Sequence, residues 1–255
     1  MGALHCGHLS LVEKALKEND ICIVSVFVNP TQFNNKEDLE KYPRNLEKDC
    51  ELLQKFSDKI IVFAPSVDEV YPEPDTRQFD FGLLDKVMEG KFRPGHFNGV
   101  AQVVSRFFDI IKPDRAYFGE KDFQQLAIMR RMTKILDLNV QVVPMPIIRE
   151  KSGLAMSSRN ERLTDNQKDI ATNISKTLFK SRDEWMLKLS VRDTLAKVVD
   201  NINSFDELDV EYFEIVDGLT LQPVRKWDES DYIVGCIAVF CGDVRLIDNI
   251  EYHSR

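Results

Sequence analysis

The sequence predicts an α/β fold, with a Rossmann-like parallel sheet followed by a smaller C-terminal α+β domain. Three observations indicate this fold. Apolar, β-branched runs alternate with helical patterns up to about residue 150, polar or proline-containing segments follow these runs, and the last apolar runs follow one another. Alternating strands and helices form parallel sheets, whereas successive strands pair antiparallel. We therefore expect a Rossmann-like domain at 1–148 and a C-terminal α+β lid domain at 149–255.

Apolar spacing places the elements of the first domain. Residues that recur at helical spacing predict helices at roughly 7–19, 39–56, 100–111 and 122–136. Continuous apolar runs predict strands at 21–28 and 59–63, and such runs suit strands buried on both faces of a parallel sheet. Further strands are expected at 115–118 and at 140–148, the latter broken by Pro144 and Pro146. Ligands bind beyond the carboxyl ends of the strands in such sheets, so the loops that follow these strands are candidate sites.

The C-terminal part has a different pattern. Residues 165–203 are highly charged and helical in spacing, whereas 210–216, 232–240 and 244–247 are predicted to be strands. Cys241-Gly242-Asp243 is the predicted hairpin turn between the last two strands, because glycine and aspartate favour tight turns. These elements form a compact α+β unit of their own.

Composition excludes several classes of function. A net charge of −8 argues against a large basic surface for nucleic acid or anionic membrane. The five cysteines are odd in number and contain no C-x-x-C pair, which predicts reduced thiols in the cytoplasm rather than a disulfide framework or a zinc ribbon. No apolar run reaches the ~18–20 residues that span a bilayer. We expect a cytoplasmic protein without a nucleic-acid or membrane partner.

The first candidate site is His5-Cys6-Gly7-His8, at the predicted start of a helix. Exposed backbone N–H groups and the helix dipole favour an anion there, so a phosphate would offset any charge on the histidines. Gly7 has no side chain, which would let a nucleotide approach the backbone. Two ordinary histidines at a helix start, or a metal-binding pair, stay open as alternatives.

The second candidate is the segment 119–125, where Gly119 ends a strand and the following residues open a helix. Lys121 would place a cation against phosphate oxygens, and Asp122 would cap the helix or reach Mg²⁺. Gln125 lies on the same helix face as Asp122. A well-capped helix with surface charges explains the segment equally well.

Two polar loops complete the set of candidates. Ser157, Ser158 and Arg159 suit the binding of phosphate oxygens, and a solvated turn is the alternative. Asn29 and Gln32 follow a strand and offer neutral donors and acceptors to a hydroxylated substrate, although a plain turn is also possible. The segment 93–99 is a mobile flap or a structural connection, and we favour the connection.

Taken together, these segments resemble a known family. His-x-Gly-His before a helix, followed by Met-Ser-Ser-Arg at 156–159, is similar to the paired signature of the nucleotidylyltransferase superfamily. The finer resemblance is to the pantoate–β-alanine ligases, also called pantothenate synthetases. It covers essentially the whole chain, through blocks at 1–8, 27–33, 42–44, 93–97, 119–125, 156–160 and 242–249, in the family's order.

The resemblance implies an AMP-forming ligase of pantothenate biosynthesis. It would condense (R)-pantoate with β-alanine through a pantoyl-adenylate and release AMP and pyrophosphate. ATP would be a substrate accompanied by Mg²⁺, the domain at 1–148 would bind ATP and pantoate, and the protein would form a homodimer.

The resemblance also implies roles for individual residues. His8 would be the proton donor, and the catalytic set would be His8, His5, Lys121, Ser157 and Arg159. Gln32, Gln125 and Asn29 would bind the two small substrates. ATP would be bound by Met1, Gly2, Ala3, Leu4, His5, Cys6, Gly7, His8, Gly119, Glu120, Lys121, Asp122, Ile148, Met156, Ser157, Ser158 and Arg159. The sequence shows no complete metal site, and Asp122 is the candidate ligand.

Two features depart from the family. Cys6 stands where the family carries an acidic or amide residue, and we expect little effect because that position varies. The family has a strand and a Pro-Thr step before the first block, whereas this chain begins at Met1. We therefore expect the sheet to lack a central strand, with consequences for stability and ATP binding. Another small-molecule nucleotidylyltransferase, or a catalytically impaired nucleotide-binding protein, stay open as alternatives.

Overall fold

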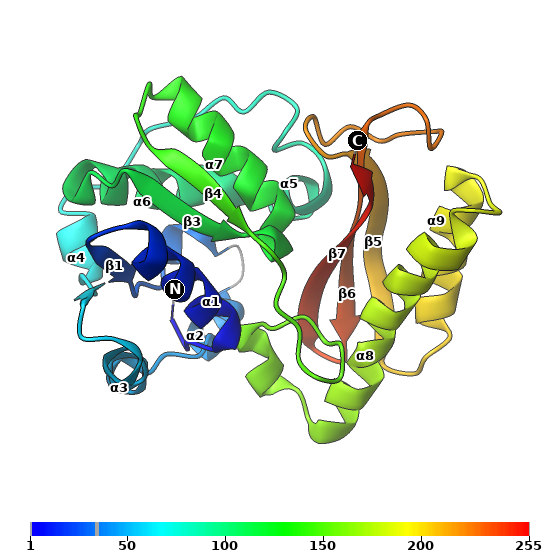
Figure 1. Ribbon diagram of the computed structural model, residues 1–255, viewed down its shortest axis with the longest axis horizontal. Helices are drawn as coiled ribbons and strands as arrows, with labels where there is room; N and C mark the ends of the chain where they lie inside the picture. The colour runs from blue at the N-terminus through cyan, green and yellow to red at the C-terminus, as the bar shows by residue number, and fades with distance from the viewer. Residues whose placement is uncertain (1, 34–35, 255) are drawn as a thin grey trace.

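A computed structural model describes residues 2–33 and 36–254, and it divides into two lobes (Figure 1). The first lobe holds the parallel strands with helices around them, and the second holds an antiparallel sheet with two long helices along it. The predicted mixed α/β fold is confirmed. None of the described helices is both long and apolar enough to cross a membrane.

The parallel strands of the first lobe form two pairs. β1 (Cys22–Ser25) pairs with β2 (Ile60–Phe63), and β3 (Arg115–Gly119) pairs with β4 (Gln141–Met145). Among the described residues these pairs are separate two-stranded sheets. α1 (Cys6–Glu18) connects them, because Val12 and Tyr117 join the apolar cluster that also contains Val24.

The other helices of the first lobe include two that begin within four residues of a predicted start, at His96 and Phe123, and two short ones that were not predicted. They are α2 (Lys36–Lys41), α3 (Leu46–Phe56), α4 (Val67–Val70), α5 (Met88–Phe92), α6 (His96–Ile111) and α7 (Phe123–Ile135). The prediction of one helix at 39–56 is wrong, since Tyr42 and Pro43 separate α2 from α3. Proline disfavours helical backbone in the residue before it, and the Asn45 side chain then caps α3 by accepting from the Lys48 N–H at 3.0 Å.

The prediction that the first two strands are buried on both faces is also wrong. Ile23 of β1 and Ile61 of β2 are paired neighbours, and they are 38% and 53% exposed. The other face packs on α1 and α3 through residues such as Val24 and Leu53. A continuous apolar run cannot reveal this difference, because burial depends on which elements cover each face.

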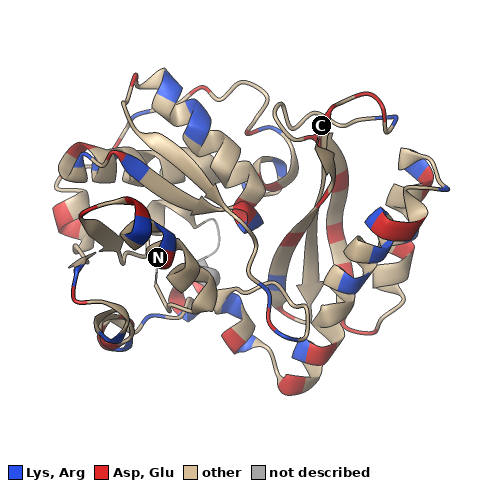
Figure 2. Ribbon diagram, in the orientation of Figure 1, with Lys and Arg blue, Asp and Glu red and all other residues tan. Residues whose placement is uncertain are grey.

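The second lobe is built on three long strands. β5 (Leu208–Asp217), β6 (Tyr232–Cys241) and β7 (Val244–Ser254) pair antiparallel in that order. The predicted hairpin turn is confirmed, because Cys241 pairs with Val244 and Gly242 has a φ of +54°. α8 (Asp165–Lys180) continues into a π-helical turn, Ser181–Trp185, and α9 (Val191–Asn203) follows. Both helices carry charges of both signs (Figure 2) and pack their apolar sides against the sheet.

The two lobes contact each other through α5, α7 and the antiparallel sheet. Met88 and Phe123 of the first lobe share an apolar cluster with Val216 and Val234 of the second. Glu89 of α5 accepts both terminal guanidinium N–H groups of Arg245, at 2.9 and 2.7 Å. Apolar contact and a buried ion pair therefore hold the lobes together beside the carboxyl ends of the parallel strands.

Candidate active site

The start of α1 presents two imidazoles held in one orientation. The Gly7 N–H donates to His5 Nδ1 at 3.1 Å, and the His5 N–H donates to His8 Nδ1 at 3.3 Å. A backbone N–H only donates, so both Nδ1 atoms accept and each neutral ring carries its hydrogen on Nε2. The ring centroids are 4.0 Å apart. The pair therefore offers two Nε2–H donors at a helix N-terminus, where an anion is favoured.

Burial keeps both imidazoles neutral. Burial, followed by the charges of His5 and Lys121, lowers the pKa of His8 to about 3. Burial and the charge of Lys121 also lower the pKa of His5, against a smaller opposing effect of Asp122 and Glu150. A negative ligand between these groups would raise the pKa of both histidines, because an opposite charge favours the protonated form.

Packing around position 7 requires a glycine, in addition to the expected approach of a nucleotide to the backbone. A Cβ at this position would lie 2.9 Å from Cε1 of His5. Any larger residue would therefore displace the His5 imidazole. A Cβ added at Gly7 would also lie 3.5 Å from the Met156 Cβ. Gly7 therefore lets the 156–160 loop lie close to α1.

Asp49 holds the backbone that leads into α1, and the sequence analysis missed it. Its carboxylate accepts the Leu4 N–H at 2.7 Å and the Ala3 N–H at 3.0 Å. Ala3 has a φ of +48°, which is uncommon for a residue with a side chain. Asp49 is 2% exposed and lies four residues before Leu53 on the buried face of α3. An acidic residue at a core-facing helical position was the available signal.

The 156–160 loop is attached to the same backbone. Ser158 is 6% exposed, and its hydroxyl donates to the Ala3 carbonyl at 3.0 Å. The Met156 N–H donates to the Ile148 carbonyl at 3.0 Å, which ties the loop to the chain after β4. Ser157 caps the short helix η3 (Ser158–Arg162) by accepting from the Arg159 N–H. The structure thus brings together the His5-Cys6-Gly7-His8 segment and the 156–160 loop.

The 119–125 segment lies at the junction of the lobes. It forms the short helix η2 (Glu120–Asp122) and the start of α7. Asn249 of β7 donates to the carbonyls of Glu120 and Lys121, at 2.8 and 3.1 Å. A small cavity of about 30 Å³ adjoins this segment, and its lining includes Arg93, His96, Lys121, Asp122 and Gln125. Asn249 was not among the predicted site residues, because its partner lies 129 residues away.

Gln32 is held against α6 by its backbone. The short helix η1 (Pro30–Gln32) packs closely on α6, because a Cβ at Gly99 would lie 2.6 Å from the Thr31 carbonyl oxygen. His96 Nδ1 lies 2.8 Å from the Gln32 carbonyl, which only accepts, so the imidazole donates. Residues 93–95 therefore connect α5 to α6, which agrees with the preferred interpretation of the 93–99 segment, and His96 and Gly99 at the start of α6 position Gln32.

Some candidate residues lie apart from these contacts. Cys6 is exposed on the first turn of α1. The Arg159 guanidinium lies over the Tyr42 ring, 5.3 Å from its centroid. Met1 lies outside the described residues.

Comparison with known proteins identifies the family. Residues 1–251 match the model of the family described as pantoate-beta-alanine ligase. The pantothenate synthetase of Bacteroides fragilis is 59% identical over 252 residues, which cover 99% of this chain and 89% of that protein. The chain belongs to the pantoate–β-alanine ligase family. Membership makes it a ligase of pantothenate biosynthesis.

Solved structures of the pantoate–β-alanine ligase family have the same fold. A pantothenate synthetase from Thermus thermophilus superposes with a TM-score of 0.93 at 43% identity, over 99% of this chain and 91% of that one. A pantoate-beta-alanine ligase from Francisella tularensis, complexed with beta-gamma ATP and beta-alanine, gives 0.81 at 36% identity over 99% and 87%. These matches favour the ligase over another small-molecule nucleotidylyltransferase.

Proposed function

We propose that the chain joins (R)-pantoate to β-alanine in two steps at the start of α1. In the first step, a pantoate carboxylate oxygen attacks the α-phosphorus of ATP and pyrophosphate leaves, giving pantoyl-adenylate. In the second, the β-alanine amine attacks the acyl carbon, AMP leaves, and the nitrogen loses a proton. The paired Nε2–H donors of His5 and His8 carry this proposal, because they provide neutral donors where phosphate charge develops.

The ATP site would combine the segments that meet at α1. The His5 and His8 imidazoles would contact the phosphates, with Lys121, Ser157 and Arg159 supplying further donors and positive charge. The hydrogen bond from Ser158 to Ala3 supports a single site, because it joins two of these segments directly. The remaining contacts would come from Gly2, Ala3, Leu4, Cys6, Gly7, Gly119, Glu120, Asp122, Ile148, Met156 and Ser158.

The two small substrates would lie between Gln32 and Gln125. Neutral amides bind hydroxyl and carboxylate oxygens without forming an ion pair that holds the anion back. Holding the carboxylate in line with the α-phosphorus accounts for much of catalysis, since such positioning contributes ~7–11 kcal/mol in favourable cases. The fixed backbone of Gln32 suits that role.

Magnesium would accompany ATP in this proposal. No cluster of three His, Cys, Asp or Glu side chains suited to a metal ion occurs within 2–33 and 36–254. Mg²⁺ bound with a nucleotide needs one or two carboxylates, with phosphate oxygens and water completing its shell. Asp122 meets that requirement, because it is exposed and lines the same cavity as Lys121.

The lobes would open and close around the substrates, with 1–148 binding ATP and pantoate and 149–255 acting as a lid. The 30 Å³ cavity at their junction supports this, because it holds only about two water molecules and is lined from both lobes.

We also propose a cytoplasmic homodimer. The five free cysteines fit a reducing compartment, and the exposed Ile23 and Ile61 offer an apolar face for a second copy.

Asp49→Ala is expected to weaken ATP binding by about tenfold or more. The change removes the carboxylate that accepts the Ala3 and Leu4 N–H groups. Each of these hydrogen bonds contributes ~1.5–3 kcal/mol, and about 1.4 kcal/mol is tenfold in affinity. Titration calorimetry with ATP measures the effect. Glu51→Ala, on the exposed side of the same helix, is the matched control and should bind ATP normally. Equal affinity of both variants would exclude this role for Asp49.

An AMP-release assay that omits each substrate in turn tests the proposed function. AMP should accumulate only when ATP, pantoate and β-alanine are all present, with one equivalent of pantothenate formed per AMP. AMP release without pantoate would indicate a different acceptor. ATP binding without AMP release in the complete mixture would identify a nucleotide-binding protein without catalysis.

A further inference from the structure

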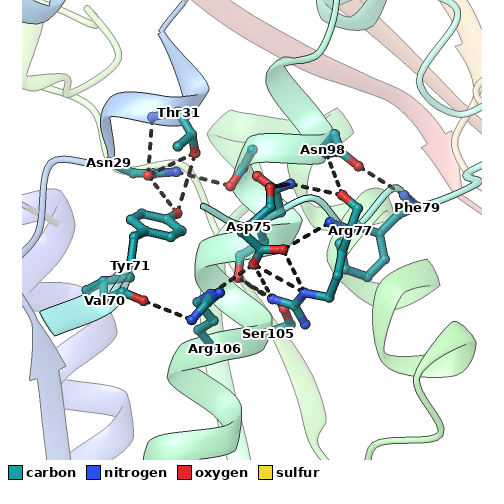
Figure 3. Close-up of polar contacts among 12 residues, drawn as sticks. Asn29, Thr31, Val70, Tyr71, Asp75, Arg77, Phe79, Asn98, Ser105 and Arg106 are labelled. Atoms are coloured by element: carbon teal, nitrogen blue, oxygen red, sulfur yellow. Dashed lines mark hydrogen bonds and ion pairs between the residues drawn. The ribbon is translucent and has the colours of Figure 1, made fainter. Parts of the chain in front are cut away.

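Asn29 is a buried amide whose hydrogen-bonding capacity is used within the protein. Its side chain is 2% exposed, at the entrance to η1. Its Oδ1 accepts from the Tyr71 hydroxyl at 2.9 Å, the Thr31 hydroxyl at 3.0 Å and the Thr31 N–H at 3.4 Å (Figure 3). Its Nδ2 donates to the Gly99 carbonyl at 3.0 Å and to Gln32 Oε1 at 3.3 Å. Asn29 therefore has little capacity left for a ligand.

The backbone fixes which way this amide points. The Thr31 N–H only donates and the Gly99 carbonyl only accepts. A flipped Asn29 amide would therefore place its NH2 group against the Thr31 N–H and its oxygen against the Gly99 carbonyl oxygen. The second Nδ2 hydrogen then points at Gln32, which must turn its Oε1 toward Asn29. The Gln32 Nε2 group consequently faces away from Asn29 as a donor.

Tyr71 is itself held in place from behind. The Arg106 guanidinium lies over its ring at 5.3 Å and donates to the Val70 carbonyl at 3.0 Å. Arg106 also donates to Asp75 at 2.8 Å, and Arg77 donates to the same carboxylate at 2.6 Å (Figure 3). Hydrogen bonds from Arg77 and then Arg106 lower the pKa of Asp75, against the effect of its burial, so this carboxylate stays charged.

We propose that Tyr71 is a positioning residue: its hydroxyl holds the Asn29 amide in the orientation that the backbone sets, and that amide in turn keeps Gln32 with its Nε2 toward the acid substrate. The Gln32 Nε2–H then donates to a hydroxyl oxygen at that point of the substrate. The inference rests on the proposed role of Gln32 in pantoate binding. A site built to bond a substrate hydroxyl discriminates against an analogue that lacks it, so Tyr71 would contribute to selection of a hydroxy acid.

Tyr71→Phe tests this directly. The variant keeps the ring over Arg106 and removes only the hydroxyl. We expect the KM for pantoate to rise about fivefold, with the KM for ATP unchanged, since one hydrogen bond contributes about that factor in affinity. The preference for pantoate over its deoxy analogue should fall by a similar factor. Tyr117→Phe is the matched control, since Tyr117 also makes two side-chain hydrogen bonds, to Asn19 and Glu18 at the far end of α1.

A double-mutant cycle with Gln32→Glu separates positioning from general destabilisation. Gln32→Glu removes the donor, so it should raise the KM for pantoate, and Tyr71→Phe should then add no further increase. An equal fivefold increase in both backgrounds would overturn the proposal, and so would an unchanged KM in Tyr71→Phe alone. Unchanged pantoate binding in Gln32→Glu would instead overturn the role of Gln32 in the proposed function.

Discussion

His8→Ala is expected to lower turnover by about 10²–10⁴-fold while the protein stays folded, since a positioned proton-transfer or charge-stabilising group contributes that much. Burial and neighbouring positive charge lower the pKa of His8 to about 3, so the free imidazole is a neutral Nε2–H donor near pH 7. Its Nδ1 is already occupied by the His5 N–H. The loss should therefore appear in kcat, measured by AMP release at saturating substrates.

Two variants sharpen this prediction. His8→Gln keeps a neutral N–H donor, and we expect it to retain about tenfold more activity than His8→Ala. His253→Ala removes a histidine on β7 that bonds the Ser230 carbonyl, and it should leave turnover unchanged. Near-normal turnover in a folded His8→Ala protein, with its thermal midpoint within a few degrees of the parent, would remove His8 from the chemistry.

Arg245→Met is expected to destabilise the protein by ~3–5 kcal/mol, because it leaves Glu89 charged and buried without its partner. Glu89 also accepts from Tyr212 at 2.9 Å and Arg93 at 3.3 Å, but Arg245 makes the two-bond contact between the lobes. For a protein of this size the loss corresponds to a fall of roughly 6–20 °C in the unfolding midpoint. Thermal unfolding at pH 7 measures it.

The pKa of Glu89 makes the expected loss of stability depend on pH. Burial alone would raise the pKa of Glu89, but hydrogen bonds and charge from Arg245 outweigh it and lower the pKa from 4.5 to about 2. The stabilisation is therefore complete above pH 4.5 and is lost as the pH falls toward 2. The stability difference between parent and variant should shrink over that range.

Two controls isolate the buried pair. Arg182→Met breaks an exposed pair with Asp183, and it should change stability by no more than about 1 kcal/mol. Glu89→Gln combined with Arg245→Met should recover part of the loss, since Glu89 then carries no buried charge and only the bond from Arg245 to Glu211 is still missing. Equal effects of Arg245→Met and Arg182→Met would contradict the account of the interlobe pair.

Local signals predicted much of this fold. Helical spacing placed α1, α6 and α7 within a few residues, and Gly242-Asp243 marked the hairpin turn. Tyr42-Pro43 marks the break between α2 and α3 in the sequence, but the apolar spacing runs across it. Burial of β1 on one face was not predictable, because it depends on elements far along the chain.

The candidate site was predictable where neighbouring residues carry it. His5, Gly7 and His8 interact within one turn, so their arrangement follows from the helix start. Asp49 and Asn249 escaped prediction because each acts on backbone far away in sequence, 45 and 129 residues distant. Such contacts leave no periodic pattern, and only the folded arrangement of the lobes shows them.

Exchange of labelled pyrophosphate into ATP tests the central claim most directly, because it isolates adenylate formation. We predict exchange with pantoate alone, no requirement for β-alanine, and loss of exchange in His8→Ala. Exchange that needs β-alanine, or exchange that proceeds without pantoate, would contradict a pantoyl-adenylate formed at the start of α1.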